Sequence, residues 1–182
     1  MKHQFTPAKN TWLLTAFASI FLSLAACQNV IDDPPLSCPA LKMTATIGTK
    51  VNIMHFSSGI IFRSRTDSGG LKLLNIETAS DSVKIVFNLT DGMYDESAMK
   101  NDSLHRDTFY FPHRGAPGKG LVVVSVANNN GNFDLLTTDT SQIIIDKVNT
   151  RAKTISGSFS FMANSGTVTG RGTFENACYV SL

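Results

Sequence analysis

The polar residues best suited to bind a metal ion or to transfer protons are concentrated between residues 105 and 114. This segment contains two histidines, two arginines, one acid and one tyrosine: His105, Arg106, Asp107, Tyr110, His113 and Arg114. His105 and Asp107 would share one face of a strand, because side chains two positions apart point the same way. Together with His113 they could ligate a metal such as zinc. Groupings this loose also occur at solvated strand ends. We therefore expect no metal site and treat the segment, together with Tyr94, as a candidate binding surface.

A glycine-rich stretch, Gly115–Gly120 (GAPGKG), follows this segment. It resembles a phosphate-binding loop, but His113 stands where the first glycine is required and Gly120 stands in place of the hydroxyl residue after the lysine. A strand-like run follows where the phosphate loop needs a helix. The sequence therefore predicts no nucleotide site.

Motifs of nucleophilic or metal-dependent hydrolysis are absent from the chain, including Gly-x-Ser-x-Gly and His-Glu-x-x-His. The three glutamates, Glu77, Glu96 and Glu175, are far apart in the sequence. We expect no catalytic residue, no cofactor and no enzymatic activity. A hydrolase whose groups meet only in space is kept as an alternative.

The N-terminus has the features of a secretory signal. Lys2 and Lys9 precede an uncharged, mostly apolar run from Thr11 to Ala26, and a run of about 16 residues is shorter than the ~20 that cross a bilayer. The run ends in Leu24-Ala25-Ala26-Cys27, which resembles the bacterial lipobox, so Cys27 would become the first mature residue and carry acyl chains such as palmitate. Several acyl chains anchor a protein stably in a membrane. The alternative is an uncleaved membrane anchor.

The residues after Cys27 bear on location. Gln28 stands where aspartate retains lipoproteins in the inner membrane of well-studied diderm bacteria, so the resemblance implies the outer membrane. Asp32-Asp33 loosely resembles the acidic export signal of Bacteroidota surface lipoproteins. We expect an outer-membrane lipoprotein at the cell surface or on the periplasmic face, with a signal over 1–26, a tether over 27–40 and one domain over 41–182.

Cleavage before Cys27 changes the composition. The signal carries two of the 16 basic residues and none of the 14 acidic ones, so the mature chain is formally neutral. Nucleic-acid binding, which needs a basic surface, loses its support. The only tryptophan, Trp12, leaves with the signal, and three tyrosines that can stack on sugars remain: Tyr94, Tyr110 and Tyr179.

Two further cysteines, Cys38 and Cys178, lie near opposite ends of the mature chain. An exported protein matures in an oxidising compartment, which favours a disulfide between them. Two independent thiols are the alternative.

The rest of the chain has the alternation of β-strands. Apolar residues fall at every second position in Val83–Leu89, and Ile155, Phe159 and Phe161 alternate with serines and threonines in 154–161. Turn signals separate such runs: Asp67–Gly70, Asp91-Gly92, Asn128–Gly131 and Asn164–Gly166. The best candidate for a helix is the short segment 96–102. We predict an all-β domain of about nine or ten strands, either an antiparallel sandwich or a calycin-like barrel.

The C-terminal third carries a strand ending in Lys147, the segment 153–161 with its sGtFsF-like pattern, and a closing strand with Gly172 and Phe174. This arrangement resembles a family of small uncharacterised β-rich Bacteroidota lipoproteins, and Asp91–Tyr94 is similar to an earlier element of that family. The resemblance implies an all-β domain behind a lipobox. It implies no activity and no catalytic residues.

Two serines, Ser82 and Ser103, lie in Asp-Ser-aliphatic tripeptides that resemble O-glycosylation sites of exported Bacteroidota proteins. Taken together, these features lead us to expect a membrane-anchored, non-enzymatic module that binds an unknown ligand or protein partner. The alternatives are a structural or inhibitory envelope protein that docks on another protein, and a hydrolase.

Overall fold

The computed structural model describes residues 38–64, 70–93 and 104–181. Every regular element among them is a strand, and no helix there is long and apolar enough to cross a membrane. The eleven strands slightly exceed the predicted nine or ten. They are β1 (Lys42–Ile47), β2 (Lys50–Ser64), β3 (Leu71–Ala79), β4 (Val83–Met93), β5 (Thr108–Phe111), β6 (Gly120–Ala127), β7 (Phe133–Leu136), β8 (Thr138–Asn149), β9 (Thr154–Ala163), β10 (Val168–Cys178) and β11 (Val180–Ser181).

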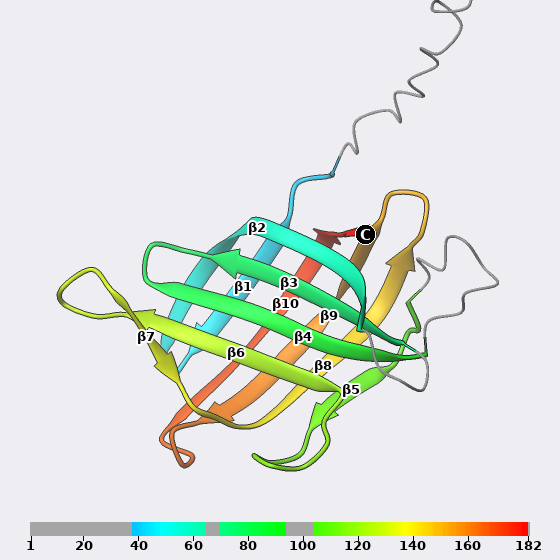
Figure 1. Cartoon of the computed structure of the whole chain (residues 1–182). Coiled ribbons are helices and arrows are strands. Elements are labelled where there is room, and N and C mark those ends of the chain that lie inside the picture. Colours follow the sequence, from blue (N-terminus) through cyan, green and yellow to red (C-terminus); the bar gives the residue numbers. More distant parts are fainter. Residues whose placement is uncertain (1–37, 65–69, 94–103, 182) are drawn as a thin grey trace, which may run out of the picture. The chain divides into compact units, whose positions relative to one another are not determined.

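One hydrogen-bonded ladder runs in the order β5-β8-β9-β10-β1-β2-β3-β4-β6-β7 (Figure 1). Its pairs are antiparallel, while the short β11 pairs in parallel with β2. Within the described residues the end strands β5 and β7 are not paired with each other, so the sheet is not closed into a barrel. The fold is therefore all-β and sandwich-like, which decides between the two predicted architectures.

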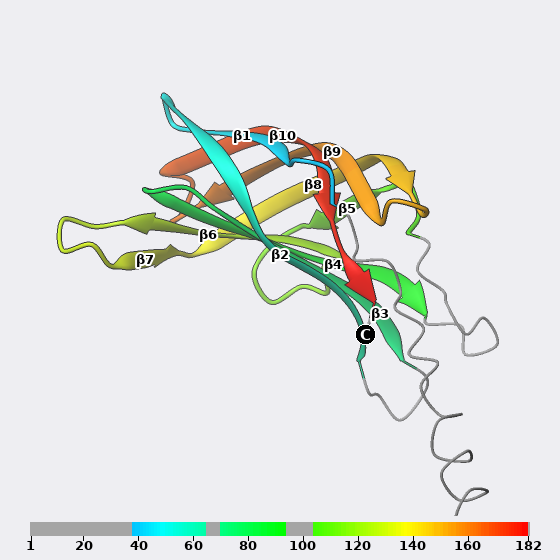
Figure 2. The same cartoon turned by 90° about the horizontal axis from the view of Figure 1, so that it is seen from above.

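Strand β2 makes the corner of the sandwich. Its first half pairs with β1 and, from His55 onward, it pairs with β3, with an irregularity in register between Phe56 and Ser58. Bulges are a common way for one strand to pass between two packed sheets. We call β5, β8, β9, β10, β1 and the first half of β2 sheet A, and the second half of β2 with β3, β4, β6 and β7 sheet B. Figure 2 shows β2 passing from one layer to the other.

The core lies between the sheets and follows the predicted alternation. Val83, Ile85, Phe87 and Leu89 are all buried, as are Ile155, Phe159 and Phe161. The ring of Phe87 in sheet B lies 5.0 Å from that of Phe159 and 5.2 Å from that of Phe174, both in sheet A. These aromatic contacts join the two layers at the centre of the domain.

Side-chain hydroxyls connect β8 to β6 where a backbone ladder would have closed a barrel. Ser141 donates to the carbonyl of Gly120 at 2.9 Å and accepts from the amide of Val122 at 3.0 Å. Thr138 donates to the carbonyl of Val122 at 2.6 Å. Both hydroxyl residues are buried, and they satisfy backbone groups of β6 that its neighbour β7 does not reach.

Cys38 and Cys178 form a disulfide, as the sequence predicted, with their Cα atoms 5.9 Å apart. The bond joins the segment before β1 to the end of β10 and closes a loop with a sequence separation of 140. On the chain-entropy view, a loop of that length stabilises the fold by about 4–5 kcal/mol.

The turn predictions at Asn128–Gly131 and Asn164–Gly166 are confirmed, whereas the one at Asp91-Gly92 is wrong. These two residues lie inside β4, where the register with β3 shifts between Leu71 and Leu73. Gly92 has a φ of +69°. The glycine therefore makes a bulge in a continuous strand instead of a turn.

Candidate binding face on sheet A

The segment around His105 does not form the predicted cluster. His105 and Asp107 precede β5 instead of sharing a strand face. The Nδ1 atom of His105 lies 2.8 Å from Oδ1 of Asp91, and the backbone amide of His105 donates to Oδ2 of Asp91 at 3.1 Å. The residue that contacts this histidine thus comes from the bulge of β4, a partner that sequence spacing did not indicate.

Asp91 also pairs with a buried cation. The Nζ of Lys72 lies 3.0 Å from Oδ2 of Asp91, and the two side chains are 2% and 5% exposed. Lys72 stands opposite the Asp91-Gly92 bulge in the register, so the two inward side chains meet at one end of the core. Burial by itself would raise the pKa of Asp91. The hydrogen bonds from Lys72 and His105 outweigh that effect, so the pKa is lowered from its usual value.

This Lys72–Asp91–His105 group can orient an imidazole, because the carboxylate holds one ring nitrogen and leaves the other toward solvent. Acid–base catalysis would also need a substrate site or a nucleophile beside the second nitrogen. Among the described residues, no hydroxyl or thiol is hydrogen-bonded to His105. The oriented imidazole of His105 is therefore the only feature of this group that supports the hydrolase alternative.

The other predicted surface residues are dispersed. Arg106, His113 and Arg114 are exposed; Asp107 accepts a hydrogen bond from the amide of Thr108, and Nδ1 of His113 lies near the carbonyl of Arg114. The described part of the chain holds no group of three metal-ligating residues. Cys27, Tyr94, Ser103 and the segment 96–102 lie outside the described residues.

Ser82 lies in the turn between β3 and β4, and its hydroxyl is engaged: it donates to Asn52 and accepts from Lys50, both at 3.2 Å.

Of the tyrosines considered for stacking, Tyr179 is fully buried and burial raises its pKa, whereas Tyr110 is 56% exposed. Only Tyr110 of these two is available to a ligand.

The structure assembles a different polar surface, on the outer face of sheet A. The registers align outward side chains of six strands in two rows. The first row, in spatial order from β2 to β5, is Val51, Thr46, Arg171, Ser160, Gln142 and Tyr110. The second row is Ile53, Thr44, Thr173, Ser158, Ile144 and Thr108. Strands about 4.8 Å apart make each row about 24 Å long.

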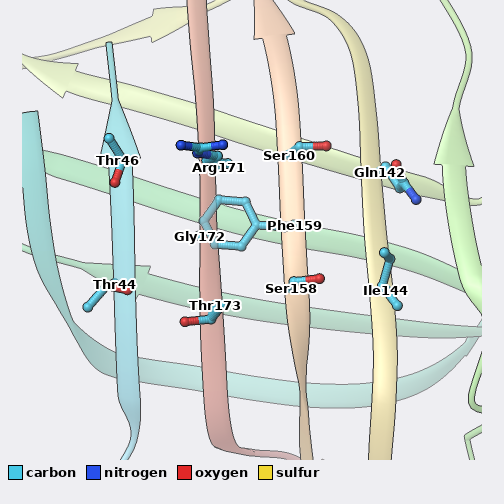
Figure 3. A pocket seen from close by; sticks show the side chains of 10 residues that line it. All are labelled: Thr44, Thr46, Gln142, Ile144, Ser158, Phe159, Ser160, Arg171, Gly172 and Thr173. Carbon is cyan, nitrogen blue, oxygen red and sulfur yellow. The ribbon is translucent and has the colours of Figure 1, made fainter. Parts of the chain in front are cut away.

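The middle of this face is hollowed into a groove of about 430 Å³, which we call the sheet A groove. It is lined by the central members of both rows together with Phe159 and Gly172. Figure 3 shows the two levels of side chains, with Arg171 in the middle of the upper one. Two adjoining hollows share Ser160 and Thr169 and have volumes of about 380 and 420 Å³. The three hollows thus adjoin one another over β8, β9 and β10.

Two glycines flank Arg171 on the opposite side of β10. A Cβ atom on Gly172 would collide with the carbonyl of Thr44 and the ring of Phe159, and one on Gly170 would collide with the ring of Phe161. Because these positions carry no side chain, the aromatic rings pack directly under β10. The groove therefore has a rigid aromatic floor beneath a layer of short polar side chains.

The polar groups of the groove are not used by the rest of the described chain. No hydrogen bond joins Thr44, Thr46, Ser158, Ser160 or Thr173 through its side chain to another described residue, and Arg171 makes neither a hydrogen bond nor an ion pair there. The weak contact from Gln142 to the Tyr110 hydroxyl, at 3.5 Å, is the exception. Arg171 is also the only charged residue in the two rows.

This surface was not predicted from the sequence, although the polar pattern of each of its central strands is visible there. The pairs Thr44/Thr46 and Ser158/Ser160 and the set Thr169/Arg171/Thr173 place short polar residues at alternate positions. In 154–161 the serines alternate with buried residues, as the sequence indicated, whereas Thr154 is itself buried. What the sequence does not contain is the register that aligns these sets side by side.

No protein-family model, no curated protein and no solved structure matches the chain.

Proposed function

We propose that this protein is an outer-membrane lipoprotein, anchored through acyl chains on Cys27, that works as a non-enzymatic binding module. The observation that carries the proposal is the sheet A groove, in which the serine, threonine and arginine side chains have no partner among the described residues. Ligand sites combine a concave surface with a few polar groups that fix orientation. The groove supplies both over a length that suits an extended ligand.

The rigid floor adds to this argument. The backbone of paired strands loses little freedom when a ligand binds, and the short serine and threonine side chains have few rotamers to fix, so less of the interaction energy is spent on ordering this part of the site. Tyr110, which the sequence placed in the candidate surface, stands at the end of the first row and extends the same face.

Blocking the groove tests the proposal. Ser160 is exposed in the middle of the face, so Ser160→Trp should fill the groove without entering the core. We expect the full chain to lose retention on an array of envelope and host polysaccharides, with unchanged thermal unfolding. Asn129→Trp, in the exposed turn between β6 and β7, is the matched control. Equal retention by wild type and Ser160→Trp would overturn the proposed site.

The anchor is tested separately. Replacing the thiol in Cys27→Ser should move the chain from the membrane fraction to the soluble fraction, because the thioether cannot form. Protease treatment of intact cells, with a periplasmic protein as control, then distinguishes the cell surface from the periplasmic face. Persistence of Cys27→Ser in the membrane fraction would contradict the lipid anchor.

A second function, docking on another protein, is favoured by one separate observation. The β1–β2 hairpin has a two-residue turn with Gly48 at a φ of +58°, so Val51 and Ile53 turn their backbone amides and carbonyls away from β1. No described strand pairs with them there, because pairing with β3 starts only at His55. Their side chains are 64% and 69% exposed, and open edges with such residues accept an added strand.

Crosslinking in cells tests this second function. Ile53→Lys should abolish recovery of a stoichiometric protein partner, because it places a charge in the edge contact. Leu135→Lys, at an equally exposed position on the end strand β7, is the control. Recovery of the same partner with both variants would contradict docking through the β2 edge.

A further inference from the structure

We infer that the ligand of the sheet A groove is an acidic polysaccharide, whose anionic group binds Arg171 while its hydroxyls bind the serines and threonines on either side. This inference rests on the proposed binding function and specifies its ligand class. Three features carry it: the unpaired charge, the spacing of hydroxyls and the absence of free backbone in the groove.

The first feature is the positive charge of Arg171. Arg171 is exposed at the centre of the first row, and its guanidinium has no described partner. The nearest acid along β10, Glu175, faces Lys42 on β1, and their charged atoms lie 3.9 Å apart. Arg171 is thus not neutralised from its own strand. A guanidinium binds carboxylate and similar anions through two parallel hydrogen bonds.

The second feature is the regular spacing of hydrogen-bonding side chains across the sheet. Thr46 lies beside Arg171 on β1 and Ser160 lies beside it on β9, followed by Gln142 on β8. The strand separation therefore presents a hydrogen-bonding group about every 4.8 Å across the sheet. A sugar chain lying across the strands would meet donors and acceptors along its length. Threonine methyls and Ile144 supply apolar patches for the C–H faces of the rings.

The end of the row adds a stacking surface. Tyr110 is more than half exposed and follows Gln142 in the register. An amphipathic ring of this kind offers an apolar face and a hydroxyl to the same ligand. It lies on the side of the face opposite to Val51, so it marks one end of the expected path of the sugar chain.

Two other polyanions fit less well. An acidic peptide would bind a sheet most readily by adding a strand, but β8, β9, β10 and β1 each have hydrogen-bonded neighbours on both sides. Nucleic acid requires several cations aligned with its phosphates, and the two rows contain one. A chain of hydroxyl-rich rings with spaced anionic groups therefore fits the groove best.

The test uses the full chain in detergent, with three polymers immobilised at equal density: a polyuronate, the same polymer after reduction of its carboxylates, and polyglutamate. We expect wild type to bind the polyuronate and to bind the reduced polymer roughly 10- to 100-fold more weakly, the range expected for losing a charge-assisted hydrogen-bonded pair. Arg171→Gln should lose the same factor on the polyuronate, and Arg171→Lys should recover part of it. Arg151→Gln removes an equal charge from an exposed turn outside the groove and should bind as wild type does.

The outcomes separate the inference from the proposed function. Equal binding of polyuronate and reduced polymer, both lost in Ser160→Trp, would overturn the acidic ligand and leave the groove as a binding site. Binding of polyglutamate in preference to polyuronate, abolished by Arg171→Gln, would replace the polysaccharide with an acidic polypeptide. Absence of any binding that Ser160→Trp removes would overturn both proposals. Unchanged thermal unfolding of each variant verifies that the fold is intact.

Discussion

Lys72 and Arg171 are both cations on strands of the sandwich, yet they occupy opposite environments. Lys72 points into the core, is 2% exposed and lies 3.0 Å from Asp91. Arg171 points outward from β10, is exposed and has no described partner. The first residue is surrounded by the interior of the protein, and the second by short hydroxyl side chains and solvent.

The difference follows from the cost of desolvating a charge. A cation in the core must be paired, because an isolated buried charge costs several kcal/mol. The charge of Lys72 is therefore committed to the fold through Asp91. Arg171 remains hydrated and needs no internal partner, so its charge is available to a ligand. We expect changes at the first site to act on stability and changes at the second to act on binding.

The largest effect should come from removing the buried anion. Asp91→Asn leaves Lys72 buried beside a neutral amide, and we expect the unfolding free energy to fall by about 3–5 kcal/mol, measured by urea denaturation. The double variant Lys72→Met/Asp91→Leu, which removes both charges, should be closer to wild type. If Asp91→Asn were as stable as wild type, Lys72 would not depend on Asp91 as its buried partner.

Gly172 lies directly beneath the groove and tests its floor. A Cβ there would meet the carbonyl of Thr44, which cannot move without shifting β1, so Gly172→Ala should lower the unfolding free energy by about 1–3 kcal/mol. Gly170→Ala would meet only the ring of Phe161 and should lose less. Equal losses in calorimetric melting would indicate that the backbone contact has no special weight.

The stability that the Lys72–Asp91 pair contributes should depend on pH. Asp91 has a lowered pKa in the folded state, so its contribution is complete above the unfolded-state value near 3.9 and disappears as the pH falls through the folded-state value. The stability difference between wild type and Asp91→Asn should therefore be constant near neutrality and shrink on acidification below about pH 4. Denaturation series at several pH values measure this. A difference that stays constant down to pH 2 would contradict the assigned ion pair.

The smallest effect should come from the exposed cation. Arg171→Gln removes no internal contact, so we expect the unfolding free energy to change by at most about 0.5 kcal/mol, although polysaccharide binding falls. A loss comparable to that of Asp91→Asn would mean that Arg171 is part of the fold, and the contrast between the two cations would fail.

The strands themselves were largely predictable, because burial on one face of a sheet forces alternation. Val83–Leu89 and the aromatic residues of 154–161 show this directly. The Cys38–Cys178 bond was predictable for another reason, since these two cysteines remain in the mature domain of an exported chain. The bulge at Asp91-Gly92 was mistaken for a turn, since glycine with positive φ serves both purposes. His105 was grouped with Asp107 by spacing, whereas its partner is 14 residues away in the sequence.

The sequence by itself determined the all-β class, the apolar and polar faces of several strands and the pairing of the two cysteines, because these depend on local alternation and on composition. Only the tertiary structure decided which polar faces became neighbours and that the sheet stayed open. Strand order and register are set by packing between distant segments. Thr46, Arg171 and Ser160 come from three separate stretches of the chain, and they form one surface only after β1 and β9 have paired with β10.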